Sequence, residues 1–225
     1  MAATLDIVGS RWALLVVREL VLGPRRFGQI ESGLETAAAD MVASRLRALV
    51  AAGVVNHTDD RRYELTTSGF GLVPTLRTLS DWTLSQRHGE GIPDLLPDVD
   101  IVRRLMAMLA IFGRTTLCPA DRFTRVGSVG LTCDDVTVIA RPEPRGESHV
   151  SFVITDEESH AVDDTTSSTT RSTAVTHHSA HFRVDGLATF ALSQTSLSTL
   201  IANNAVEPSD DTARAFLEHL TGRPS

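Results

Sequence analysis

The sequence predicts an α+β protein built from two parts. In residues 1–88, apolar positions recur three and four apart, and two short strand-like runs flank a polar turn. Residues 101–225 open with another helical pattern and then change to runs typical of strands. Between them, residues 89–100 are rich in Gly, Pro and acidic residues and are predicted to be a linker. With 225 residues, 42% of them hydrophobic, the chain can form two modest domains.

The first part is predicted to start with two helices. Residues 5–8 indicate a short helix closed by Gly9, and Ser10 is expected to cap a helix over residues 11–22. Gly23 and Pro24 end that helix, because proline disfavours the helical conformation in the residue before it.

A helix-turn-helix pattern follows. Its two helices each have one apolar face, with Phe27, Ile30 and Leu34 on the first and Val42, Leu46, Leu49 and Val50 on the second. Gly53 can take the left-handed conformation that closes the second helix. A pair of helices whose second member exposes one face suits the DNA major groove.

A hairpin and a long helix complete the first part. Residues 54–57 and 62–65 are expected to pair around the polar turn 58–61, which makes the whole a winged helix. The long helix is expected to start at Thr66 or Thr67, with Pro74 bending its second turn. Its apolar stripe contains Leu72, Leu76, Leu79 and Trp82.

The second part is predicted to contain an antiparallel sheet covered by helices. The sequence Asp185-Gly186 is a hairpin signal, and the Ser/Thr/Asp tract 160–173 indicates a loop. Helices are expected over 101–112, 193–201 and 210–220, and strands over 126–131, 136–140, 149–155, 174–184 and 187–192.

Composition narrows the class of protein. No apolar run reaches the ~18–20 residues of a membrane span, and the first ten residues do not resemble a secretory signal. Cys118 and Cys133 are too few for a disulfide framework and fit a reduced cytoplasmic compartment. The net charge of −7 argues against non-specific coating of nucleic acid, and the whole acid excess lies in residues 87–225. All 21 basic residues are Arg, which suggests a high-GC bacterial source.

Arginines cluster on the elements that a winged helix would turn toward DNA. Guanidinium groups bind phosphates in a two-pronged manner and can read guanine edges. The alternative is local pairing, of Arg47 with a nearby acid or of Arg61 with Asp59 or Asp60. The predicted DNA contacts are Arg25, Arg26, Thr36, Met41, Ser44, Arg45, Arg47, Arg61 and Arg62.

The histidines at 177, 178 and 181 first suggest a metal site. On a strand, however, His177 and His181 would share a face about 13 Å apart, at roughly 3.3 Å per residue. His178 would instead lie on the face of Phe182 and line an inner cavity. No GxSxG, HExxH or phosphate-binding glycine loop is present, so we predict no enzyme, metal or cofactor.

The first part resembles the HxlR-type winged-helix regulators of bacteria, relatives of the MarR group. The resemblance implies a homodimer that binds double-stranded operator DNA. It differs from the family in having no Cys near residues 1–4, so no thiol switch is implied, and in carrying His57 in place of an Arg. The matching segments are residues 11–15, 18–20, 23–27, 45–49, 53–55 and 63–69.

The second part resembles the sterol-carrier-protein-like domains, through residues 184–186 and 196–201. This resemblance implies an apolar cavity and a small hydrophobic ligand, for which Phe152, His178 and Phe182 are the predicted contacts.

Together these features predict a homodimeric cytoplasmic transcriptional regulator. Helices over 5–8, 72–82 and 101–112 carry apolar surface that fits either a dimer or an internal core. A ligand in residues 101–225 is expected to shift the helices at 67–86 and 101–112 and so change operator affinity. The alternative is a scaffold that uses the winged helix for protein contacts, because the second helix is alanine-rich and carries Asp40.

Overall fold

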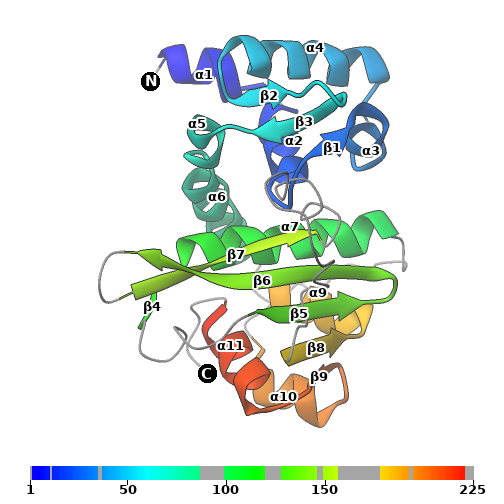
Figure 1. The fold of residues 1–225 in the computed structure, drawn as a ribbon, viewed down its shortest axis with the longest axis vertical. Coiled ribbons are helices and arrows are strands. Elements are labelled where there is room, and N and C mark those ends of the chain that lie inside the picture. The colour runs from blue at the N-terminus through cyan, green and yellow to red at the C-terminus, as the bar shows by residue number, and fades with distance from the viewer. Residues whose placement is uncertain are drawn as a thin grey trace, which may run out of the picture. The chain divides into compact units, whose positions relative to one another are not determined.

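The computed structural model describes residues 2–10, 12–34, 37–86, 99–119, 128–145, 149–156, 178–192 and 195–220 (Figure 1). The chain divides into two compact units, Met1–Arg87 (unit 1) and His88–Ser225 (unit 2). Within the described ranges, no helix has the length and apolarity that crossing a membrane requires.

Unit 1 is a winged helix, as predicted. Its strands form an antiparallel sheet in the order β1-β3-β2. In chain order its elements are α1 Ala2–Val8, α2 Ala13–Leu20, β1 Arg25–Arg26, α3 Phe27–Ser32, α4 Ala39–Ala51, β2 Val55–His57, β3 Arg62–Leu65, α5 Thr67–Phe70 and α6 Val73–Gln86.

The predicted apolar face anchors α4. Val42, Leu46 and Leu49 are buried, and α4 packs on α2, α3 and β2. Gly53 ends the turn after α4 with φ +70°, the left-handed conformation expected for it. The sequence pattern therefore located this helix and its inner face correctly.

Two details of the first helices differ from the prediction. Helix α2 starts at Ala13 with Trp12 in the N-cap position, and the Ser10 hydroxyl has no hydrogen-bond partner among the described residues, so Ser10 does not cap the helix. Arg25 and Arg26 form the short strand β1. The sequence did not predict this strand, because two residues are too few to show the alternation of apolar and polar positions that indicates a strand.

The predicted long helix is divided into α5 and α6. The Thr66 hydroxyl accepts a hydrogen bond from the Gly69 N–H at 3.0 Å and caps α5. Pro74 then falls in the first turn of α6, where a missing N–H leaves no hydrogen bond unmade. The proline consequently marks a helix start and not a bend.

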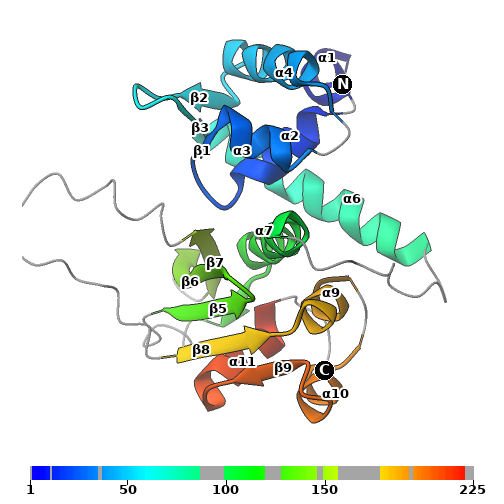
Figure 2. The same cartoon turned by 90° about the vertical axis from the view of Figure 1, so that its right-hand side faces the viewer.

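Unit 2 is an α+β unit with a six-stranded sheet in the order β4-β7-β6-β5-β8-β9. Its strands are labelled in Figure 1, and Figure 2 shows β7, β6, β5, β8 and β9 from another side. The pairs are antiparallel as predicted, except that β5 and β8 are parallel. Its elements are α7 Val99–Thr115, β4 Cys118–Pro119, β5 Val129–Cys133, β6 Val136–Arg145, β7 His149–Asp156, β8 His178–Phe182, α9 Val184–Leu192, α10 Leu197–Ala202, β9 Val206–Pro208 and α11 Asp211–Leu220.

The predicted returning strand over 187–192 is instead helix α9. Asp185 lies in its first turn, where an acidic residue is favoured by the helix dipole, and Leu187, Phe190 and Ala191 are buried at helical spacing. Gly186 is needed for close packing, because a Cβ there would lie 2.1 Å from the carbonyl oxygen of Ala205. The Asp-Gly pair therefore starts a helix and does not form a hairpin turn.

Aromatic rings fill the core between the sheet and the helices. Phe152 on β7 meets Phe216 on α11 edge to face, with ring centroids 4.7 Å apart, and both side chains are fully buried. Helix α7 packs on β7, on β6 and on α11. Residues 89–98 of the predicted linker 89–100 lie outside the described residues, and its last two residues belong to α7. The tract 160–173 and the start of the predicted strand, 174–177, also lie outside the described residues.

Candidate nucleic-acid interface

Helix α4 presents a continuous outward surface. The exposed residues on this surface follow helical spacing and are Asp40, Met41, Ser44, Arg47, Ala48 and Ala51. Arg45 lies at the flank and is half-buried. Thr36 lies outside the described residues. The residues that sequence analysis assigned to the groove-facing side of α4 are thus mostly solvent-exposed.

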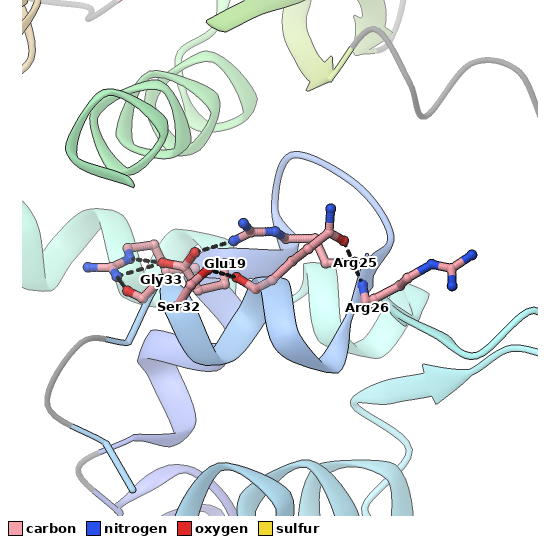
Figure 3. A network of polar contacts seen from close by, with 7 residues as sticks. Glu19, Arg25, Arg26, Ser32 and Gly33 are labelled. Carbon is pink, nitrogen blue, oxygen red and sulfur yellow. Dashed lines mark hydrogen bonds and ion pairs between the residues drawn. The ribbon is translucent and has the colours of Figure 1, made fainter. Parts of the chain in front are cut away.

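Arg25 belongs to the interior and not to the surface. Its Nη1 lies 2.5 Å from Oε2 of Glu19, and both residues are only 4% exposed (Figure 3). Arg18 binds the other oxygen, Oε1, at 2.6 Å, so two guanidinium groups neutralise one buried carboxylate. A Cβ at Gly33 would lie 2.2 Å from Glu19 Oε2, so only glycine leaves room for this ion pair. The prediction that Arg25 contacts DNA is therefore wrong, because its guanidinium is buried against Glu19.

The neighbouring Arg26 has the opposite environment. Its side chain is exposed and points away from the ion-pair network (Figure 3). Its N–H donates to the Gln29 side chain at 2.8 Å, which fixes the start of α3. In the sheet Arg26 is directly opposite Arg62, so β1 and β3 bring two guanidinium-bearing residues together.

The turn between β2 and β3 is held by its own side chains. The Thr58 hydroxyl donates to the Asp60 carboxylate and accepts from the Arg62 N–H at 3.1 Å. The hydrogen bond from Thr58, followed by the charge of Arg62, holds the pKa of Asp60 below its usual value. Asp60 pairs with Arg62 at 3.0 Å. Arg61 sits at φ 62° with an exposed side chain and makes no ion pair within the described residues.

Cross-strand contacts stiffen the hairpin, and sequence analysis did not anticipate them. The rings of His57 and Tyr63 stack with centroids 4.4 Å apart. Asn56 donates to Glu64 at 2.9 Å from the opposite strand. The signal that could have found them is the register, because both pairs are directly opposed in the β2–β3 ladder.

The structure thus separates six predicted arginines into three groups. Arg25 is buried in an ion pair, and Arg45 and Arg62 are half-buried. The remaining three, from β1, α4 and the hairpin turn, are exposed and have no ion pair among the described residues: Arg26, Arg47 and Arg61. This arrangement can bind a polyanion whose charges are spread along an extended surface.

A family model and several known proteins match part of the chain. Residues 7–90 match the model of the family described as HxlR-like helix-turn-helix. The chain is 36% identical over 83 residues to the HTH-type transcriptional regulator YvaP of Bacillus subtilis and covers 77% of that protein. The chain belongs to the HxlR-like helix-turn-helix family. It is also 38% identical over 84 residues to the HTH-type transcriptional regulator Rv3095 of Mycobacterium tuberculosis, of which it spans about half, 52%.

Solved structures also match part of this HxlR-like chain. The quinone-bound form of YodB from B. subtilis is 28% identical, with 37% of this chain and 93% of that chain covered and a TM-score of 0.35. The reduced form of the redox regulator HypR is 27% identical, with 39% and 92% covered and a TM-score of 0.35. The family match ends at residue 90.

The predicted ligand contacts of this HxlR-like chain lie in unit 2, beyond the family match. Phe152 packs on Phe216, and Phe182 lies 5.6 Å from Phe190, measured between ring centroids. His178 is half-buried, and its Nδ1 lies 2.8 Å from Oδ2 of Asp210. Phe152 and Phe182 are therefore core side chains, whereas His178 joins β8 to the residue preceding α11.

Asp210 and Cys133 are two groups of unit 2 whose surroundings shift their pKa values. The hydrogen bond from His178, followed by that from the Ala213 N–H, lowers the pKa of Asp210. Burial raises the pKa of the Cys133 thiol to about 11, so it stays protonated at neutral pH. Among the described residues, no three His, Cys, Asp or Glu side chains are grouped as metal ligands, and His177 lies outside them.

Proposed function

We propose that the protein is a transcriptional regulator that binds double-stranded operator DNA through unit 1. Helix α4 would enter the major groove, while Arg26 and Arg61 would contact phosphates beside it. The observation that carries the proposal is the set of exposed arginines on three elements, Arg26, Arg47 and Arg61. Membership of the HxlR-like helix-turn-helix family supports it.

The opposed pair in the small sheet adds a physical reason. Arg26 and Arg62 are directly opposite on antiparallel strands, a position where like charges destabilise a sheet. Among the residues that the structure describes, Asp60 pairs with Arg62, and no acidic side chain pairs with Arg26. A bound phosphate would balance the second guanidinium, so this corner of unit 1 gains stability when it binds a nucleic acid.

The test is a salt titration of duplex binding by the full chain. Each lost phosphate contact reduces the slope of log K against log salt by about 0.9. We expect Arg26→Ala and Arg61→Ala each to lower the slope by about that amount. Arg214→Ala on α11 is the matched control and should leave it unchanged. Binding that ignores salt would favour the alternative, a scaffold that contacts proteins through the winged helix.

We propose further that the regulator is a homodimer that associates through α6. Leu79 and Trp82, three residues apart on this helix, are 47% and 63% exposed. A second copy related by a two-fold axis would cover them and would present two copies of α4 to DNA. Light scattering should report a dimer for the wild type and for Thr83→Glu, and a monomer for Leu79→Glu/Trp82→Glu. A monomeric wild type at micromolar concentration would remove this proposal.

Finally, we propose that unit 2 senses a small hydrophobic ligand. The support is its separate aromatic core, in which Phe152 and Phe182 meet helices that a ligand could displace, with the polar His178 on the same sheet face. Operator affinity would be measured with fatty acids and apolar aromatic acids, in the wild type and in Phe182→Ala. Equal affinity with every compound would remove the sensing role and leave DNA binding intact.

A further inference from the structure

The outward surface of α4 has an unusual chemistry for a helix placed in a DNA groove. The helix carries no asparagine, glutamine, lysine or glutamate. Its only exposed charged residues are Asp40 and Arg47, and Met41 is an exposed apolar side chain, 43% accessible. Alanine at positions 48 and 51 and Ser44 complete the surface.

Each base edge in the major groove demands a different side chain. Guanine is read by Arg or Lys, adenine by Asn or Gln, and cytosine by an acidic acceptor, whereas the thymine methyl group is read by apolar contact. Helix α4 has no amide side chain for adenine. It has one exposed cation and one exposed carboxylate, that of Asp40, which also accepts a hydrogen bond from the Met41 N–H at 2.9 Å. The largest class of groups left for reading bases is therefore apolar.

The apolar groups are also suitably placed along the helix. Met41 and Ala48 are seven residues apart, so they lie on the same side of α4. Two turns separate them by about 10.5 Å along the axis, close to the rise of three base pairs. Ser44 lies between them and can bond to any base, while Arg47 lies toward the Asp40 edge of the surface.

We infer that α4 reads its operator mainly through thymine methyl groups, contacted by Met41 and Ala48. This inference rests on the proposed DNA binding and adds the class of base that the helix recognises. Arg47 contributes affinity from its own edge of the surface. The operator half-site is expected to carry thymines about three base pairs apart, on the part of the groove that α4 enters.

Removing the methyl groups tests this directly. Duplexes that bind the full-length protein would first be selected from a random pool, and each thymine of the half-site would then be replaced by deoxyuridine. Loss of one buried methyl should weaken binding about fourfold at a contacted position. In Met41→Ala the replacement beneath residue 41 should have no further effect, because the contact is already absent. Arg47→Ala is the control, which should weaken all duplexes and retain the fourfold loss.

The outcomes separate the two proposals. Salt-dependent binding that tolerates deoxyuridine at every position would overturn thymine recognition and leave DNA binding standing. Thymine recognition would also be overturned if no thymine position distinguished the wild type from Met41→Ala when deoxyuridine replaces it, and the selected half-site was rich in adenine or guanine. Failure to bind any duplex in a salt-dependent way would overturn both.

Discussion

The adjacent residues Arg25 and Arg26 provide a sharp test of how unit 1 is built. Replacing Arg25 by Met leaves the buried carboxylate of Glu19 with Arg18 as its remaining ion-pair partner. Breaking a buried ion pair costs about 3–5 kcal/mol, and the surviving Arg18 contact places this case near 3 kcal/mol. For a unit of this size, that loss lowers the melting temperature by roughly 10–20 °C. Arg26→Met, at an exposed position, should change the melting temperature by less than about 3 °C.

Tryptophan fluorescence is a suitable assay because both tryptophans, Trp12 and Trp82, belong to unit 1. Thermal unfolding of the two single variants would be compared with Glu19→Leu/Arg25→Met, which removes both buried charges together. Replacing a buried pair by apolar groups is often nearly neutral, so the double variant should regain most of the lost stability. Equal melting temperatures for Arg25→Met and Arg26→Met would refute the burial argument.

The remaining predictions concern two glycines, the thiol of Cys133 and the carboxylate of Asp210. Gly28→Ala, in open space on α3, should raise the free energy of unfolding by about 0.5–1 kcal/mol. Gly53→Ala should lower it by about 1 kcal/mol, because Gly53 has a φ of +70°. Urea unfolding that gives the reverse order of stability would contradict both predictions. The thiol of Cys133, with a pKa raised to about 11, should resist iodoacetamide at pH 8 in the folded protein and react with it in urea. The measurement uses a variant in which the other cysteine is replaced by serine. Fast labelling of the folded protein would contradict the burial of Cys133. In His178→Asn the pKa of Asp210 should rise toward 3.8, as followed by carbon NMR. Because the pKa of Asp210 is lowered in the folded protein, the stabilisation from its carboxylate is present above pH 3.8 and is lost as the pH falls through the folded pKa. An unchanged Asp210 pKa in His178→Asn would exclude His178 as the cause.

Much of unit 1 could be predicted from local patterns. The inner face of α4 follows from the spacing of Val42, Leu46 and Leu49, and its end follows from Gly53. The roles of Arg25 and Arg26 could not be distinguished, because the two residues are identical and adjacent. Only the tertiary approach of Glu19 decides which one is buried.

Unit 2 was less accessible to the same reasoning. An Asp-Gly pair favours both a hairpin turn and the first turn of a helix, and the packing of Gly186 against Ala205 decides between them. The parallel pairing of β5 with β8 joins segments separated by two strands and many intervening residues. No local signal specifies such a pairing, because it depends on contacts distant in sequence.

The two-residue length of β1 has a consequence for protein engineering. Because alternate residues of a strand face opposite sides, inserting one residue before β1 would exchange the sides that the two arginines face. The guanidinium that is now exposed would then replace the buried one beside Glu19. A design that transfers the β2–β3 hairpin and α4 into another regulator should therefore transfer Glu19, Gly33 and β1 together with them. A graft that carries α4 alone would lack the buried ion pair that fixes the register of β1.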